Sequence, residues 1–177
     1  MSKKLSEHFT LEELTYSDTA KKYKISNLPT PIHEKTLVHT CQYLLEPLRK
    51  LLNEKYKEYK GKKVKGVSIR ITSGYRGPAL NAKVGGVKTS QHCSGEAADL
   101  EAKLIFQDNT SKVLPYTELY ADVKTFVKAG KLSVDQCIQE CVGSAKWVHV
   151  SHSAAGKTKD RKQFLIYDGK TYREDKK

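Results

Sequence analysis

The sequence predicts an α+β fold in which N-terminal helices pack on a mostly antiparallel sheet. Apolar residues recur every three or four positions over residues 37–52, which is typical of one face of a helix. The period changes to two over residues 67–71, which is typical of a strand, and further strand-like runs follow. Helices followed by strands indicate an α+β arrangement. Because the chain contains no repeat and no linker, we expect one domain over residues 1–177, with a core at about 8–167 and a basic C-terminal tail.

Two helices are predicted near the N-terminus. Residues 10–13 (Thr-Leu-Glu-Glu) fit a capping box, so a short helix begins after Thr10. Thr30 and Pro31 suit the N-cap and the first position of a longer helix. Pro47 lies within that helix and is expected to kink it or to restart it. The apolar stripe of the longer helix consists of Leu37, Cys41, Leu44, Leu45, Leu48 and Leu52.

A long loop follows the first predicted strand. Val67, Ile69 and Ile71 alternate with polar residues and form that strand. Residues 73–91 are then rich in Gly, Pro, Asn and Ser, so we expect a loop with one helical turn near Ala79. A loop of this length inside a compact domain usually serves a function.

The second half of the chain is predicted to contain mostly strands. The patterns favour a helix over residues 119–127, which Gly130 closes. The remaining strands are expected at residues 97–101, 135–140, 147–151 and 163–167.

The chain is strongly basic. Its 32 Lys and Arg residues against 20 Asp and Glu residues give a net charge of +12 over 177 residues. Such a surplus indicates an anionic partner, which could be nucleic acid, a membrane surface or an acidic cell-wall polymer. The longest apolar run, residues 164–167, is too short to span a membrane, so we expect no membrane insertion. The four cysteines are irregularly spaced and do not indicate a disulfide framework.

Three residues form a candidate metal site. His92 and Asp99 are close in sequence, with Gly95 available for a turn between them. In the segment 147–151, strand alternation puts Trp147 and His149 on one face. Two imidazoles and one carboxylate, with one position left for water, are the ligand set of a catalytic zinc site. A single histidine on a strand is more often a surface or core residue than a metal ligand, but the three residues together favour a metal site.

The motifs around these residues resemble the M15 family of zinc peptidases. That family includes D-Ala-D-Ala carboxypeptidases and dipeptidases and the L-alanyl-D-glutamate endolysins of phages. The resemblance covers about residues 8 to 167, and the zinc-binding element is also similar to that of the Hedgehog signalling domain. The segments that carry it are 9–14, 73–76, Asn81, 84–86, 90–99 and 147–151.

By position, the resemblance implies that His92, Asp99 and His149 are the Zn²⁺ ligands. The family also needs a carboxylate that takes a proton from the attacking water and returns it to the leaving amine. In several M15 enzymes this acid lies three residues before the last histidine ligand, where this chain has Lys146. In another branch, and in Hedgehog domains, the acid lies at the end of the preceding strand, where this chain has Glu140.

The resemblance also suggests residues that contact the substrate. Arg76 matches the family arginine that holds the substrate or the developing oxyanion, and so joins Glu140 as a predicted catalytic residue. Ser90 would bind the substrate backbone or cap the turn, and Tyr75 and Trp147 are expected to contact substrate. His152 would assist the transition state or lie at the rim of the site, and we favour the rim.

The implied function is a zinc-dependent peptidase that hydrolyses stem peptides of peptidoglycan at a bond involving a D-amino acid. It would act as a carboxypeptidase or as an endolysin-type endopeptidase. The alternative is a zinc-binding module of the same fold that has lost catalysis. A basic nucleic-acid-binding protein is the third reading, and the chain contains no recognition motif that supports it.

The sequence also bears on location and partners. Residues 1–4 are charged, but no apolar segment follows, so no signal peptide is expected and synthesis would be cytoplasmic. The protein would then reach the cell wall after release through a phage or prophage lesion, and a chain trimmed of its leader is equally compatible. We expect a monomer that binds peptidoglycan peptide and no specific nucleic acid. The lysines of residues 55–65 and of the tail beyond Gly156 are expected to attract an anionic wall polymer.

Overall fold

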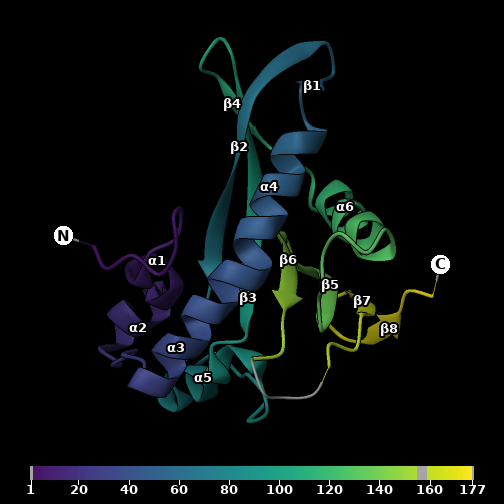
Figure 1. The fold of residues 1–177 in the computed structure, drawn as a ribbon. Coiled ribbons are helices and arrows are strands. Elements are labelled where there is room, and N and C mark those ends of the chain that lie inside the picture. The colour runs from purple at the N-terminus through teal and green to yellow at the C-terminus, as the bar shows by residue number, and fades with distance from the viewer. Residues whose placement is uncertain (1, 155–158, 177) are drawn as a thin grey trace.

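The computed structural model describes residues 2–154 and 159–176, which form helices packed on one mixed sheet (Figure 1). Within those residues the sheet has eight strands. Their order is β1-β2-β3-β6-β5-β7-β8, and β4 lies off this path and pairs with β3. All pairs are antiparallel except β5 with β7. The predicted α+β fold with a mostly antiparallel sheet is therefore confirmed. The strands are β1 (Glu58–Tyr59), β2 (Lys62–Ser73), β3 (Ala97–Phe106), β4 (Ser111–Val113), β5 (Gln136–Val142), β6 (Ala145–Ser151), β7 (Gln163–Tyr167) and β8 (Tyr172–Glu174).

The helices begin where local sequence signals place them. Thr10 caps α1 in a capping box with Glu13, and Thr30 caps α3 with Pro31 at its first position, as predicted. The expected helical turn near Ala79 is α5. The helical segments are α1 (Leu11–Thr15), α2 (Asp18–Tyr23), α3 (Pro31–Thr40), the π-helix η1 (Cys41–Leu45), α4 (Glu46–Lys55), α5 (Pro78–Lys83), the 3₁₀-helix η2 (Gln91–Ser94) and α6 (Tyr116–Lys128).

Pro47 does not restart the long helix, which runs on through a π-helical segment. The chain continues from α3 through η1 into α4, and the N–H of Glu46 donates to the carbonyl of Cys41, five residues back. A π-turn adds a residue to the helical turn just before the proline. This wider turn makes room for the Pro47 ring, which would otherwise clash with a carbonyl in the preceding turn.

The helices cover one face of the sheet and leave the other face to the polar site. Leu100 of β3 and Val148 and Val150 of β6 belong to the same buried cluster as Leu48 of α4 and Val123 of α6. Because side chains alternate along a strand, the residues between them point to the opposite face. In Figure 1 α4 crosses the sheet, and α6 lies to the right of α4. No helix in the described part of the chain is both long and apolar enough to span a bilayer.

The sheet extends beyond the predicted strands. β2 and β3 pair along residues 64–73 and 99–106, far beyond the alternation visible in sequence, because exposed lysines interrupt the pattern. The segment expected to be a basic tail contains β8, which pairs with β7, so the ordered sheet ends near Glu174 rather than near 167.

Gly74 follows β2 at a close approach to α1, and this contact gives a stability prediction. A Cβ at this position would lie 2.3 Å from the carbonyl oxygen of Leu14, which accepts a hydrogen bond from the N–H of Tyr75. Since a backbone carbonyl has little freedom to move, we expect Gly74→Ala to lower the free energy of unfolding by about 1–3 kcal/mol, measured by urea denaturation.

Gly77→Ala is the matched control. Its Cβ would meet Asn27 Oδ1 at 3.5 Å, an ordinary contact, so the expected change is within about 0.5 kcal/mol. Equal losses in the two variants would contradict the close approach of Gly74 to α1.

Candidate metal centre

Three buried side chains from three segments converge on the open face of the sheet. His92 comes from η2, Asp99 from β3 and His149 from β6, and the β3–β6 register places Asp99 opposite His149. The distance from His149 Nδ1 to Asp99 Oδ1 is 2.9 Å, and His92 Nε2 lies 3.3 Å from the same oxygen. The two ring nitrogens, His92 Nε2 and His149 Nδ1, are 3.2 Å apart. The sequence-predicted ligand set therefore meets in space.

The donor atoms fit a tetrahedral zinc ion. Nitrogen and oxygen ligands lie about 2.0–2.1 Å from zinc, so neighbouring ligand atoms of a tetrahedron are about 3.3 Å apart, close to the distances above. His92 Nδ1 lies 2.7 Å from the carbonyl oxygen of Gly74. Since a carbonyl only accepts, Nδ1 carries the proton and Nε2 keeps its lone pair for a metal. These residues could hold a metal ion with one position free.

The charge state of Asp99 suits a ligand. Burial alone would raise the pKa of the carboxyl group, but in the metal-free protein the two imidazoles beside it hold this pKa well below its usual range. Asp99 therefore remains an anionic donor at neutral pH. A buried carboxylate is tolerated here because the two imidazoles lie against it.

Glu140 lies on the same face of the sheet as the triad. In the β5–β6 hairpin Glu140 is opposite Trp147, and Ile138 is opposite His149, so alternation points all four side chains to the open face. Burial and the negative charge of Asp99 raise the pKa of Glu140 to about 7, against the opposing effects of His149 and Arg76. A carboxyl group with such a pKa can both accept and release a proton at neutral pH.

A cleft of about 610 Å³ opens over the triad. Four of the candidate site residues line it, namely Arg76, Ser90, Glu140 and Trp147. The backbone N–H of Arg76 donates to the carbonyl of His92 (3.1 Å), which ties the Arg76 loop to η2. A second hollow of about 620 Å³ shares Trp147 but contains no triad residue, so donor chemistry rather than size distinguishes the site.

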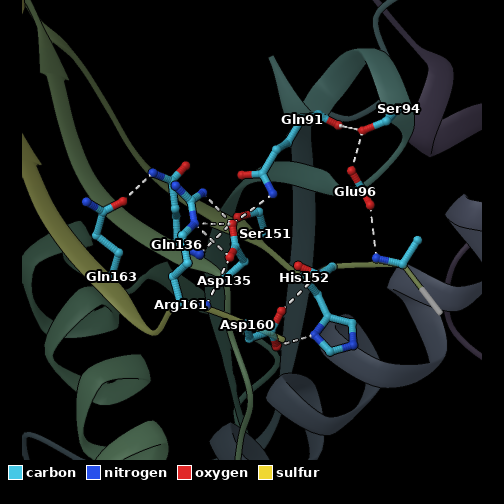
Figure 2. Close-up of polar contacts among 12 residues, drawn as sticks. Gln91, Ser94, Glu96, Asp135, Gln136, Ser151, His152, Asp160, Arg161 and Gln163 are labelled. Atoms are coloured by element: carbon cyan, nitrogen blue, oxygen red, sulfur yellow. Dashed lines mark hydrogen bonds and ion pairs between the residues drawn. The ribbon is translucent and has the colours of Figure 1, made fainter. Parts of the chain in front are cut away.

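Two predicted substrate contacts lie elsewhere. Tyr75 is buried outside the cleft lining, and its hydroxyl lies 3.1 Å from His33 Nδ1. His152 is also absent from the lining. Its Nδ1 lies 2.6 Å from Asp160 Oδ2 (Figure 2), and its ring stacks on His39 with a centroid distance of 5.2 Å. The structure therefore does not bring these two residues to the candidate site.

Several cleft residues were not predicted from sequence. Figure 2 shows Arg161 directed at Asp135, which also accepts a hydrogen bond from the Gln91 amide at 3.0 Å. Tyr167 and Tyr172 stack with ring centroids 4.3 Å apart and line the cleft from β7 and β8. Asp135 begins a predicted strand, but Arg161 and Tyr172 carried no signal, because their positions depend on how the C-terminal segment pairs with β5.

Comparison with known proteins agrees with this geometry. A search of curated proteins found no match. The family model described as Peptidase M15 matches residues 7–151, which include the whole triad, Arg76 and Glu140. Matched over well over half of its 177 residues, the chain belongs to the peptidase M15 family.

Proposed function

We propose that the protein is a zinc-dependent peptidase that hydrolyses stem peptides of peptidoglycan at a bond involving a D-amino acid. The observation that carries the proposal is the buried His92, Asp99 and His149 group beneath a cleft in a chain of the M15 family. Carboxypeptidase and endopeptidase activities are both compatible with a cleft that is open to solvent.

His92, Asp99 and His149 would hold the zinc ion, with His92 oriented by its hydrogen bond to Gly74. When bound, zinc polarises a scissile carbonyl and lowers the pKa of a coordinated water to about 7. Glu140 accepts the proton of the attacking water and later gives it to the leaving amine nitrogen. The Arg76 guanidinium faces the negative charge that develops on the carbonyl oxygen. Trp147 and Ser90 border the space for the peptide.

The partners and location belong to the same proposal. The exposed lysines of residues 55–65 would attract an anionic wall polymer. Some of these lysines have a carboxylate partner, as Lys63 has in Glu58. The protein would act at the cell wall as a monomer after release during phage or prophage lysis.

A catalytically silent metal-binding module is the alternative. Lys146 favours it, because several M15 enzymes have their catalytic acid at this position. The position of Glu140 on the cleft favours the active enzyme, and the variants below separate the two functions.

The first experiment tests metal and reaction together. We expect about one zinc per chain by metal analysis, and digestion of purified peptidoglycan that a chelator abolishes and added zinc restores, with mass spectrometry identifying the opened bond. Asp99→Asn should lose both zinc and cleavage. His152→Ala, which lies outside the triad, should keep its zinc. Protein that retains zinc after Asp99→Asn, or cleavage that survives chelation, would overturn the metal assignment.

The second prediction concerns Glu140. Glu140→Gln keeps the shape of the side chain but cannot accept a proton, so kcat should fall about 10²- to 10⁴-fold while zinc content stays unchanged. Glu101→Gln is the matched control, because Glu101 lies on the same face of the sheet, outside the cleft and paired with Arg70. An unchanged rate in Glu140→Gln would remove this residue from the mechanism.

The third prediction is a titration. In the metal-free protein Glu140 should keep its proton up to about pH 7, because burial and Asp99 both disfavour the charged form. Zinc binding should lower this pKa, since a nearby cation favours the carboxylate. Carboxyl ¹³C NMR can follow the group, whose resonance disappears in Glu140→Gln. A midpoint near the ordinary value of about 4.3 in metal-free protein would contradict the expected burial.

A further inference from the structure

One wall of the cleft is built by residues after position 151, which lie outside the part of the chain matched to the family. Arg161, Leu165, Tyr167 and Tyr172 contribute to this wall, which β7 and β8 build beside β5. The residues that would hold the metal all precede it. This wall is therefore where the chain can select among substrates without altering its donor set.

Arg161 is fixed in place by Asp135. Its backbone N–H and its Nε donate to Asp135 Oδ1 at 3.0 and 2.9 Å, and Nη2 donates to Oδ2 at 2.5 Å (Figure 2). Asp135 is buried, and the hydrogen bond from the Arg161 side chain is the main cause that lowers its pKa, so it stays ionised. The guanidinium is thus held in one orientation before any ligand arrives, which reduces the entropy lost on binding.

Arg161 keeps hydrogen-bonding capacity for a ligand. The Asp135 contacts use Nε and Nη2, and Nη1 has no hydrogen bond to a residue in the described part of the chain. The side chain remains 55% exposed while it lines the cleft. A planar, permanently charged guanidinium with free N–H groups binds a carboxylate more tightly than it binds a neutral group such as an amide.

The electrostatics of the cleft admit an anion. Its lining contains two carboxyl groups, Asp99 and Glu140, of which Asp99 lies against two imidazoles. Arg76 and Arg161 are the cations of the same lining. The stacked rings of Tyr167 and Tyr172 line the same cleft near the other end of β5, where Tyr167 pairs with Glu140, and they offer an apolar surface to other parts of a bound peptide.

We propose that Arg161 binds a carboxylate of the peptide substrate and thereby selects acidic peptides. This inference rests on the proposed peptidase function and adds a specificity determinant to it. The carboxylate has two sources, the C-terminus of the peptide or an acidic side chain, and the two would correspond to carboxypeptidase and endopeptidase action.

The test compares matched peptides on the zinc-loaded protein. One pair has a free or an amidated C-terminus, and the other has Glu or Gln within the chain. The wild type should prefer the acid in one pair by about 10- to 100-fold in kcat/KM, and Arg161→Gln should bring that ratio to about 1. Lys159→Gln is the matched control, because it removes a nearby exposed positive charge outside the cleft lining and should keep the ratio.

Two results would overturn the proposal: a wild type without preference in either pair, or a preference that survives Arg161→Gln. Because Arg161→Gln leaves Asp135 buried without its partner, its folding is checked by thermal melting. Arg161→Lys serves as the second variant, since it keeps the charge but loses the planar fork, and it should reduce the ratio without abolishing it.

Binding separates this proposal from the proposed function. Calorimetry on zinc-loaded Glu140→Gln protein, with and without Arg161→Gln, measures the preference for acid over amide without turnover. A wild type that cleaves no peptide while the binding preference persists counts against the peptidase function alone. Equal affinities for acid and amide count against the Arg161 site alone.

Discussion

The antiparallel register between β3 and β6 is the constraint on which the site depends. It sets Asp99 opposite His149 and Ala97 opposite Ser151, so the two donors share one face of the sheet. A slip of one residue would turn every side chain of one strand to the other face and separate the pair. The register is strongly specified, because Leu100, Val148 and Val150 on the reverse face are fully buried against the helices. The apolar core thereby fixes the polar site.

The loop between β2 and β3 completes the donor set through backbone contacts. The carbonyl oxygen of Gly74 accepts a hydrogen bond from His92 Nδ1–H, while the N–H of Arg76 donates to the carbonyl of His92. Both groups lie directly after β2, whose last residues pair with Asp99 and its neighbours. A side chain on Gly74 would therefore disturb the packing of α1 and the orientation of His92 at once. The chain leaves β2 at Ser73, and the loop has to bring His92 back beside Gly74 before β3 begins at Ala97.

Sequence patterns predicted the parts of the structure that depend on short-range rules. The capping box at Thr10, the proline at the start of α3 and the alternation in β2 are local signals, and the triad followed from residue chemistry combined with motif resemblance. Glu140 could be placed because a hairpin relates it to His149 by simple counting. Tyr75 lies within a motif segment and His152 follows one, but their side chains have partners of their own, His33 and Asp160, which no pattern reveals.

The C-terminal wall required tertiary information, and the topology explains why. β7 runs parallel to β5, so after β6 the chain must pass the beginning of β5 before it can pair on the far side. At that crossing the N–H of Asp135 donates to Ser151, the N–H of Lys162 to Val134, and the N–H of Gln163 to Asp135. Asp135 lies at the crossing with its carboxylate buried and needs a cation, which the crossing segment supplies as Arg161. The ion pair at this crossing leaves one edge of the Arg161 guanidinium at the cleft, so a residue that neutralises a buried carboxylate also has N–H groups free for recognition.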